Sequence, residues 1–111
     1  MAKRVLLFCF VLVIFQSCII SNPQPEKCEQ VQIKVASITE GSSYDIFFTD
    51  YQGKKYYINR GLEQGLTLNN LKKIALNREA TLHLPKFAFG DVSNHIAQLT
   101  INDSVIYTEF D

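Results

Sequence analysis

The side chains best suited to acid–base or metal chemistry are two histidines, and their spacing matches no catalytic arrangement. His83 falls in an alternating strand pattern, where we expect its ring to face solvent or a polar neighbour. His95 stands at the edge of a loop, near Asp91. The two histidines lack the helical spacing of a metal-binding pair, and no pair of cysteines is left for zinc. A joint role would require the fold to bring the two rings together.

The remaining reactive side chains are dispersed along the chain. Six acidic residues fall in separate predicted elements: Glu40, Asp45, Asp50, Glu63, Glu79 and Asp91. They therefore do not indicate the carboxylate pair of a glycosidase. No serine stands in a nucleophile elbow, and no glycine loop has Lys and Ser or Thr in the register of a phosphate-binding loop. We expect no enzyme activity, no cofactor and no metal.

The N-terminal segment has the pattern of an export signal. Lys3 and Arg4 precede an unbroken apolar run of eleven residues, from Val5 to Phe15. A membrane-spanning helix needs about 20 residues, so this run predicts a signal peptide over residues 1–17. Ordinary signal peptidase favours small residues at the last and third-last positions before its cut. Phe15 would occupy the third-last position of a cut before Cys18, so the signal fits that enzyme poorly.

The end of the signal, with Ser17 directly before Cys18, resembles the lipobox of bacterial lipoproteins. The resemblance implies cleavage before Cys18 and attachment of lipid, including palmitate, to that residue. The membrane would then be a partner through this lipid, with the domain in the cell envelope outside the cytoplasm. Ile19 is not the aspartate associated with inner-membrane retention, which favours the outer membrane. Phe15 and Gln16 depart from the usual lipobox, and an uncleaved anchor or an ordinary secreted product are the alternatives.

Removal of residues 1–17 changes the charge and the cysteine content. The chain has eleven basic and eleven acidic side chains, and loss of Lys3 and Arg4 leaves nine against eleven, a formal charge of −2. The basic excess of a nucleic-acid-binding surface is missing, so we expect no nucleic-acid partner. With lipid on Cys18, Cys28 remains a single thiol, either inert or paired between chains. Without that lipid, a Cys18–Cys28 disulfide becomes possible.

The mature chain divides into a tether and one domain. Residues 18–30 include two prolines and several polar residues, a composition that favours neither helix nor sheet, and we expect a flexible tether. About ten such residues reach on the order of 30 Å when extended. Residues 31–111 carry aliphatic and aromatic side chains throughout, which predicts a single small globular domain.

The apolar period within this domain predicts a mainly β structure with one helix. The expected segments are a strand from Val31 to Glu40, strands over 44–49 and 55–59, a helix from Leu68 to about Asn77, and strands over 80–84, 96–101 and 104–110. Thr67 is placed to cap the helix, with Leu66 packing on Leu71 as a hydrophobic staple. Asn102 and Asp103 suit the tight turn of a final hairpin.

This order, three strands, one helix and three strands, resembles the oligonucleotide and oligosaccharide binding (OB) barrel, in which a helix closes the gap between the third and fourth strands. The resemblance implies a small OB-like barrel, with a beta-grasp-like roll as the alternative. The segment from Gly53 to Thr67 also resembles stretches of small bacterial membrane proteins and lipoproteins. That likeness implies no function, and we expect Gly61 and Gly65 within it to serve chain geometry.

Aromatic residues supply the candidate binding surface. Tyr56 and Tyr57 are adjacent in a strand and must point to opposite faces. Phe87 and Phe89 lie in a region that reads as loop rather than core. The candidate surface, an apolar patch with a charged rim, consists of Tyr56, Tyr57, Arg60, Lys86, Phe87 and Phe89. The alternative is that at least three of the four rings fill the core of a small barrel.

Three classes of function are compatible with these features. The first is a tethered protein-interaction module that binds another envelope protein, for example as an inhibitor, an immunity factor or an accessory subunit. The second is a module that binds glycan or peptidoglycan fragments by aromatic stacking. The third is a small hydrolase, for which no recognisable residues are present. We expect the first, with an envelope protein as partner.

Overall fold

The computed structural model describes residues 23–111, so the predicted signal peptide, Cys18 and residues 19–22 lie outside the described part. The elements in chain order are η1 (Pro25–Lys27), β1 (Cys28–Glu40), η2 (Ser42–Tyr44), β2 (Ile46–Asp50), β3 (Lys55–Ile58), η3 (Gly61–Glu63), α2 (Leu68–Ala75), β4 (Glu79–Pro85), β5 (Gln98–Ile101) and β6 (Ser104–Thr108). The strands pair antiparallel in the order β3-β2-β1-β4-β5-β6. The predicted mainly β domain with one helix is confirmed, as is the order of its elements.

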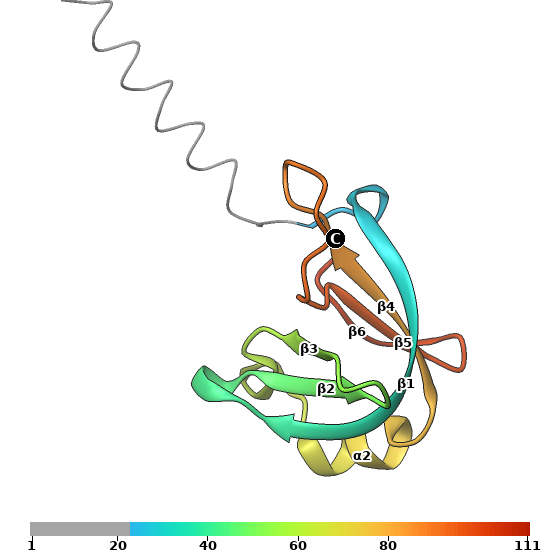
Figure 1. Cartoon of the computed structure of the whole chain (residues 1–111). Coiled ribbons are helices and arrows are strands. Elements are labelled where there is room, and N and C mark those ends of the chain that lie inside the picture. The colour runs from blue at the N-terminus through green and yellow to red at the C-terminus, as the bar shows by residue number, and fades with distance from the viewer. Residues whose placement is uncertain (1–22) are drawn as a thin grey trace, which may run out of the picture.

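The long strand β1 joins the two halves of the sheet. Its first half pairs with β4 and its second half with β2, and a bulge between Val35 and Ser37 marks the change of partner. The bulge shifts the buried positions by one residue, from Ile33 and Val35 before it to Ile38 after it. Because a bulge bends its strand, β1 curves, with β4–β6 along one part and β2–β3 along the other (Figure 1).

The two edges of the sheet differ. The Tyr57 N–H of β3 donates to the Asn94 carbonyl at 3.0 Å, and the Ile96 N–H donates to the Tyr57 carbonyl at 2.7 Å. The chain just before β5 therefore runs parallel to β3 and covers its outer edge at Tyr57. At the other end, β6 pairs only with β5 among residues 23–111.

Helix α2 is positioned by the features expected from the sequence. The Thr67 hydroxyl accepts a hydrogen bond from the Asn70 N–H at 3.3 Å. Leu71 and Ala75 are buried against the sheet, and the helix contacts β1. Asn77 has the positive φ of a helix stop, 63°. The helix has eight residues, and nothing helical in the described part of the chain is long and apolar enough to cross a membrane.

Strand β1 begins at Cys28, three residues before the expected start of the domain. Residues 28–30 pair with residues 83–85 of β4, so this part of the expected flexible tether belongs to the sheet. Glu29 and Gln30 are both exposed. The alternation of buried and exposed residues thus starts only at Val31, which explains why the sequence pattern placed the domain boundary there.

Candidate functional site

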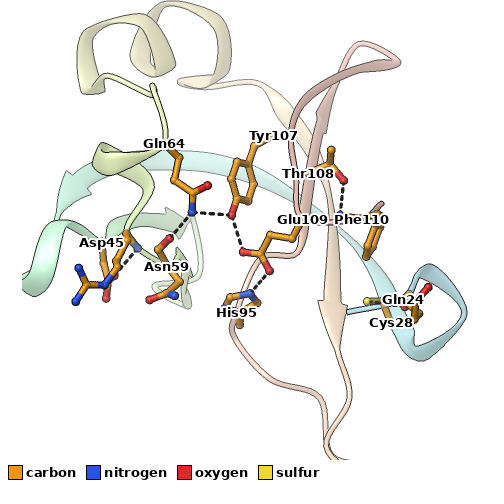
Figure 2. A network of polar contacts seen from close by, with 11 residues as sticks. Gln24, Cys28, Asp45, Asn59, Gln64, His95, Tyr107, Thr108, Glu109 and Phe110 are labelled. Atoms are coloured by element: carbon orange, nitrogen blue, oxygen red, sulfur yellow. Dashed lines mark hydrogen bonds and ion pairs between the residues drawn. The ribbon is translucent and has the colours of Figure 1, made fainter. Parts of the chain in front are cut away.

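The most extensive polar cluster of the described chain surrounds Glu109, just after β6. The Tyr107 hydroxyl donates to Glu109 Oε2 at 2.6 Å, and His95 Nε2 lies 2.7 Å from Glu109 Oε1. Gln64 Nε2 donates to the Tyr107 hydroxyl at 3.4 Å and to the Asn59 carbonyl at 3.2 Å. Figure 2 shows how this chain of contacts connects the β6 end of the sheet to the loop that follows β3.

The cluster is partly buried, and this affects the ionisation of its side chains. The side chains of His95 and Glu109 are 15% and 20% exposed, so their contact is a partly buried ion pair when the imidazole is protonated. Burial raises the pKa of Tyr107 far above its usual value, and the hydrogen bond to Glu109 and the charge of Glu109 raise it further. Burial also raises the pKa of Tyr57, with added effects of Asp45 and Glu109. Both phenols therefore remain neutral at physiological pH.

The chemistry available to this cluster is limited by its internal bonding. Both carboxylate oxygens of Glu109 and the facing nitrogen of His95 are already engaged within the chain. The His95 ring also packs edge-on against Tyr57 at 5.4 Å, and Tyr57 lies 6.0 Å from Phe47. Within residues 23–111, no group of three or more His, Cys, Asp or Glu side chains is placed to hold a metal ion. The cluster can fix the geometry of a half-buried row of rings.

Substitution of Tyr107 by phenylalanine is expected to change the response of the domain to alkaline pH. The folded state holds the phenol proton more tightly than the unfolded state, whose phenol titrates near pH 10. This stabilisation is complete below about pH 10 and is lost as pH rises further, by at most about 1.4 kcal/mol per pH unit for one group. Tyr107→Phe should lower the free energy of unfolding at pH 7 by about 1–3 kcal/mol, because Glu109 loses a donor. The variant should also show a less steep decline of the free energy of unfolding above pH 10.

The measurement is urea unfolding of both proteins at several pH values between 7 and 11. Tyr44→Phe is the matched control, because the Tyr44 side chain is 58% exposed. An equally steep alkaline decline in the wild type and in Tyr107→Phe would contradict the assignment.

The two adjacent tyrosines of β3 point to opposite faces, as predicted. Tyr56 is 3% exposed and belongs to the core, whereas Tyr57 is half-buried in the row with Phe47 and His95. Tyr56 therefore cannot contribute to a surface without disruption of the core. Only Tyr57 of this pair is available for contact with a ligand.

The other four members of the predicted surface lie in two different places. Arg60 has a left-handed backbone, with φ of 50°, and forms an exposed ion pair with Glu63 at 3.1 Å. Lys86, Phe87 and Phe89 lie in the loop that follows β4. Phe87 is 37% and Phe89 76% exposed, so the alternative, in which at least three of the four rings fill the core, is wrong. Both rings lie beyond the end of β4 at Pro85, and the core cluster includes neither of them.

The two histidines contact different partners. His95 is paired with Glu109 rather than with Asp91, its neighbour in sequence, and no short motif relates these two positions. The His83 ring packs edge-on against Phe110 at 5.7 Å. Its Nδ1 atom is buried and has no hydrogen-bond partner within residues 23–111, so this atom meets neither solvent nor a polar neighbour, although the residue as a whole is half-buried. His83 lies opposite Gln98 of β5, and this pairing, which the local sequence pattern does not reveal, determines what surrounds the ring.

A groove that the sequence did not indicate lies between α2 and the β5–β6 hairpin. It is an open depression of about 310 Å³. Its lining residues are Lys73, Ile74, Arg78, Ile101, Asn102, Ser104 and Ile106. Isoleucines from three elements supply its apolar part, and Lys73 and Arg78 are exposed cations beside it. Because these elements meet only in the folded chain, no local pattern could reveal the groove.

The glycine segment between β3 and α2 is explained by chain geometry, as expected. Gly65 has φ of 84°, which side chains disfavour. Gly61 is buried, and a Cβ atom there would lie 2.6 Å from Ile46 Cδ1. Both positions therefore need glycine for reasons of backbone and packing.

No protein-family model matches the chain, and no curated protein is significantly similar to it.

Proposed function

We propose that this chain is an envelope lipoprotein, anchored through lipid on Cys18, whose domain is a protein-interaction module without catalytic activity. The anchor rests on the basic start, the eleven-residue apolar run and Ser17 before Cys18. The interaction role rests on the groove between α2 and the β5–β6 hairpin, which combines apolar residues with two exposed cations. The outer membrane is the favoured location, because of Ile19.

The edge of β6 strengthens this role. The strand reads Ser104-Val105-Ile106-Tyr107-Thr108, without the lysine or proline that commonly protects an exposed edge. Val105 on it is 53% exposed. Ser104 and Ile106 also line the groove, so the groove and the open edge are continuous. A partner segment can add to the edge through its backbone and place side chains in the groove.

The charge of the groove suggests the chemistry of this partner. Lys73 and Arg78 face it, while Asp103 stands only in the adjoining turn. We propose an extended segment with apolar and acidic side chains, supplied by another envelope protein. Nucleic acid does not suit the net charge of −2 of the mature chain.

The proposed architecture is an OB-like barrel. Its support is the helix between the third and fourth strands, the long β1 shared by both halves of the sheet, and the parallel contact between Tyr57 and His95. A beta-grasp-like roll is less compatible with a first strand that lies between β2 and β4 and is antiparallel to both.

Photo-cross-linking tests the interaction role. A photoreactive residue at Ile74, which lines the groove and is 39% exposed, should give one defined protein adduct in intact cells. The same residue at Tyr44, outside the groove, should not. Lys73→Glu with Arg78→Glu should reduce the adduct about tenfold or more, since two reversed charges cost on the order of 1.4 kcal/mol at an interface.

Lys54→Glu with Lys55→Glu is the control, because it makes the same change in net charge outside the groove. Equal adduct yields from both double variants would contradict the proposal. So would adducts that are as strong at Tyr44 as at Ile74.

Glycan or peptidoglycan binding is the second candidate, supported by the half-buried row of Phe47, Tyr57 and His95. Rings in such a row can stack on sugar faces. Sedimentation of the wild-type chain with purified peptidoglycan, combined with no protein adduct at Ile74, would favour this candidate over the first.

A further inference from the structure

The loop between β4 and β5 carries Phe89, the most exposed large hydrophobic residue of the described chain. Phe89 is 76% and Phe87 37% exposed, and Val92 beyond them is 38% exposed. The two phenyl rings stack on each other, with centroids 5.7 Å apart and planes inclined by 13°. Such a patch has no partner within residues 23–111, and exposed apolar patches of this kind mark contact sites.

The loop is a defined turn rather than a loose connection. The Phe87 N–H donates to the Asp91 carbonyl at 2.7 Å, and the Gly90 N–H donates to the Phe87 carbonyl at 2.9 Å. Gly90 has φ of 96°, which allows the chain to reverse. A bridge between Lys86 and Val92 closes the base. The backbone therefore holds both phenyl rings outward at a fixed place.

That place adjoins the start of the described chain. The Lys86 N–H donates to the Lys27 carbonyl at 3.1 Å, and Pro85 pairs with Cys28. The loop thus starts beside η1, the first element after residues 1–22. Figure 1 shows the loop at the end of the domain where the described chain begins, and α2 at the opposite end.

The short distance between lipid and domain limits where this loop can lie. Because η1 begins at Pro25, six residues separate it from Cys18. Even fully extended, they span at most about 25 Å. The end of the domain that carries the loop must therefore stay close to any bilayer that holds Cys18.

We propose that the Phe87–Phe89 loop inserts into the interface of the same lipid bilayer that holds the Cys18 anchor, and so fixes the orientation of the domain. This inference rests on the lipid anchor of the proposed function. Aromatic rings favour the headgroup region, where Lys86 and Lys27 beside them can meet lipid phosphates, although Glu26 and Asp91 are also nearby. In this orientation α2 and the groove beside it point away from the membrane, towards a partner.

Tryptophan fluorescence tests the insertion, because the chain contains no tryptophan. The lipidated full chain carrying Phe89→Trp is reconstituted into vesicles of phosphatidylethanolamine and phosphatidylglycerol, with and without brominated acyl chains. We expect the tryptophan in the vesicle-bound protein to emit at shorter wavelength than in the unlipidated Cys18→Ala, Phe89→Trp protein in detergent-free buffer. We also expect the brominated lipids to quench this emission strongly. The control is Tyr51→Trp. Tyr51 is exposed in the turn after β2 and contacts Asn77, which follows α2. A tryptophan there should show solvent-like emission and little quenching.

Each other outcome overturns a distinct claim. If the protein remains on the vesicles but the Phe89→Trp variant is no more quenched than the Tyr51→Trp variant, the anchor stands and the docking of the loop is wrong. Blue-shifted emission that bromine does not quench, and that grows with protein density, would assign the loop to contact with a second copy of the chain. A chain that does not stay with vesicles overturns both the anchor and the docking.

Discussion

Replacement of Leu71 by aspartate is expected to unfold the domain at room temperature. Leu71 is 1% exposed and packs from α2 into the core. A carboxylate at this position loses the packing of the leucine, worth about 2–5 kcal/mol, and must also be desolvated or protonated. A domain of this size has a total stability on the order of 5–10 kcal/mol. The loss is therefore comparable with the whole free energy of folding.

Circular dichroism during thermal and urea unfolding measures this effect. Lys72→Asp is the matched control, since it introduces the same side chain one position along, on the exposed face of the helix. We expect the control to unfold cooperatively within about 1 kcal/mol of the wild type. Cooperative melting of Leu71→Asp at the wild-type temperature would contradict the assignment of α2 to the core of the fold.

Substitution of Cys18 by alanine is expected to release or mislocalise the precursor. Each buried methylene of an acyl chain contributes about 0.8 kcal/mol, and anchoring becomes stable when two or more chains are present. Loss of the acceptor removes all of this stabilisation at once. Fractionation of cells into soluble and alkali-washed membrane material, with mass spectrometry of the mature N-terminus, measures both location and lipid.

Cys28→Ala is the control for this experiment. Burial raises the pKa of the Cys28 thiol, and the nearby Glu109 and Glu26 raise it further, so this cysteine is a poor nucleophile. We expect Cys28→Ala to stay lipidated and bound to membranes. A Cys18→Ala protein that is still processed, lipid-modified and membrane-bound would refute the assignment of Cys18. An unmodified wild-type chain with a Cys18–Cys28 disulfide would do the same.

In the proposed orientation, one end of the domain contacts the membrane and the other end binds a protein. The Phe87–Phe89 loop and the chain entry lie at one end, and the groove beside α2 lies towards the other. If both proposals hold, lipid fixes the first end and leaves the open edge of β6 available to a protein. Variants at Phe89 should then change how the domain stands on the membrane without altering the groove.

The fold class was predictable because it depends on local patterns. The alternation from Val31 onwards, the helical spacing of Leu71 and Ala75, and the turn at Asn102 and Asp103 are each set by neighbours within a few residues. The last two have φ of 52° and 61°, the positive angles expected for such a turn. The start of β1 was missed because its first residues are exposed at both Glu29 and Gln30, and only pairing with β4 makes them a strand.

The sequence by itself determined the order of strands and helix, the signal-like N-terminus and the opposite faces of Tyr56 and Tyr57, because each depends on covalent spacing. Tertiary structure alone decided which of those faces is core, where Phe87 and Phe89 project, and that His95 meets Glu109. It also created the groove, from residues on α2 and a hairpin more than twenty positions away. The physical reason is that such contacts form when the curved sheet brings distant segments together, and pairing partners across a sheet leave no local periodic signal.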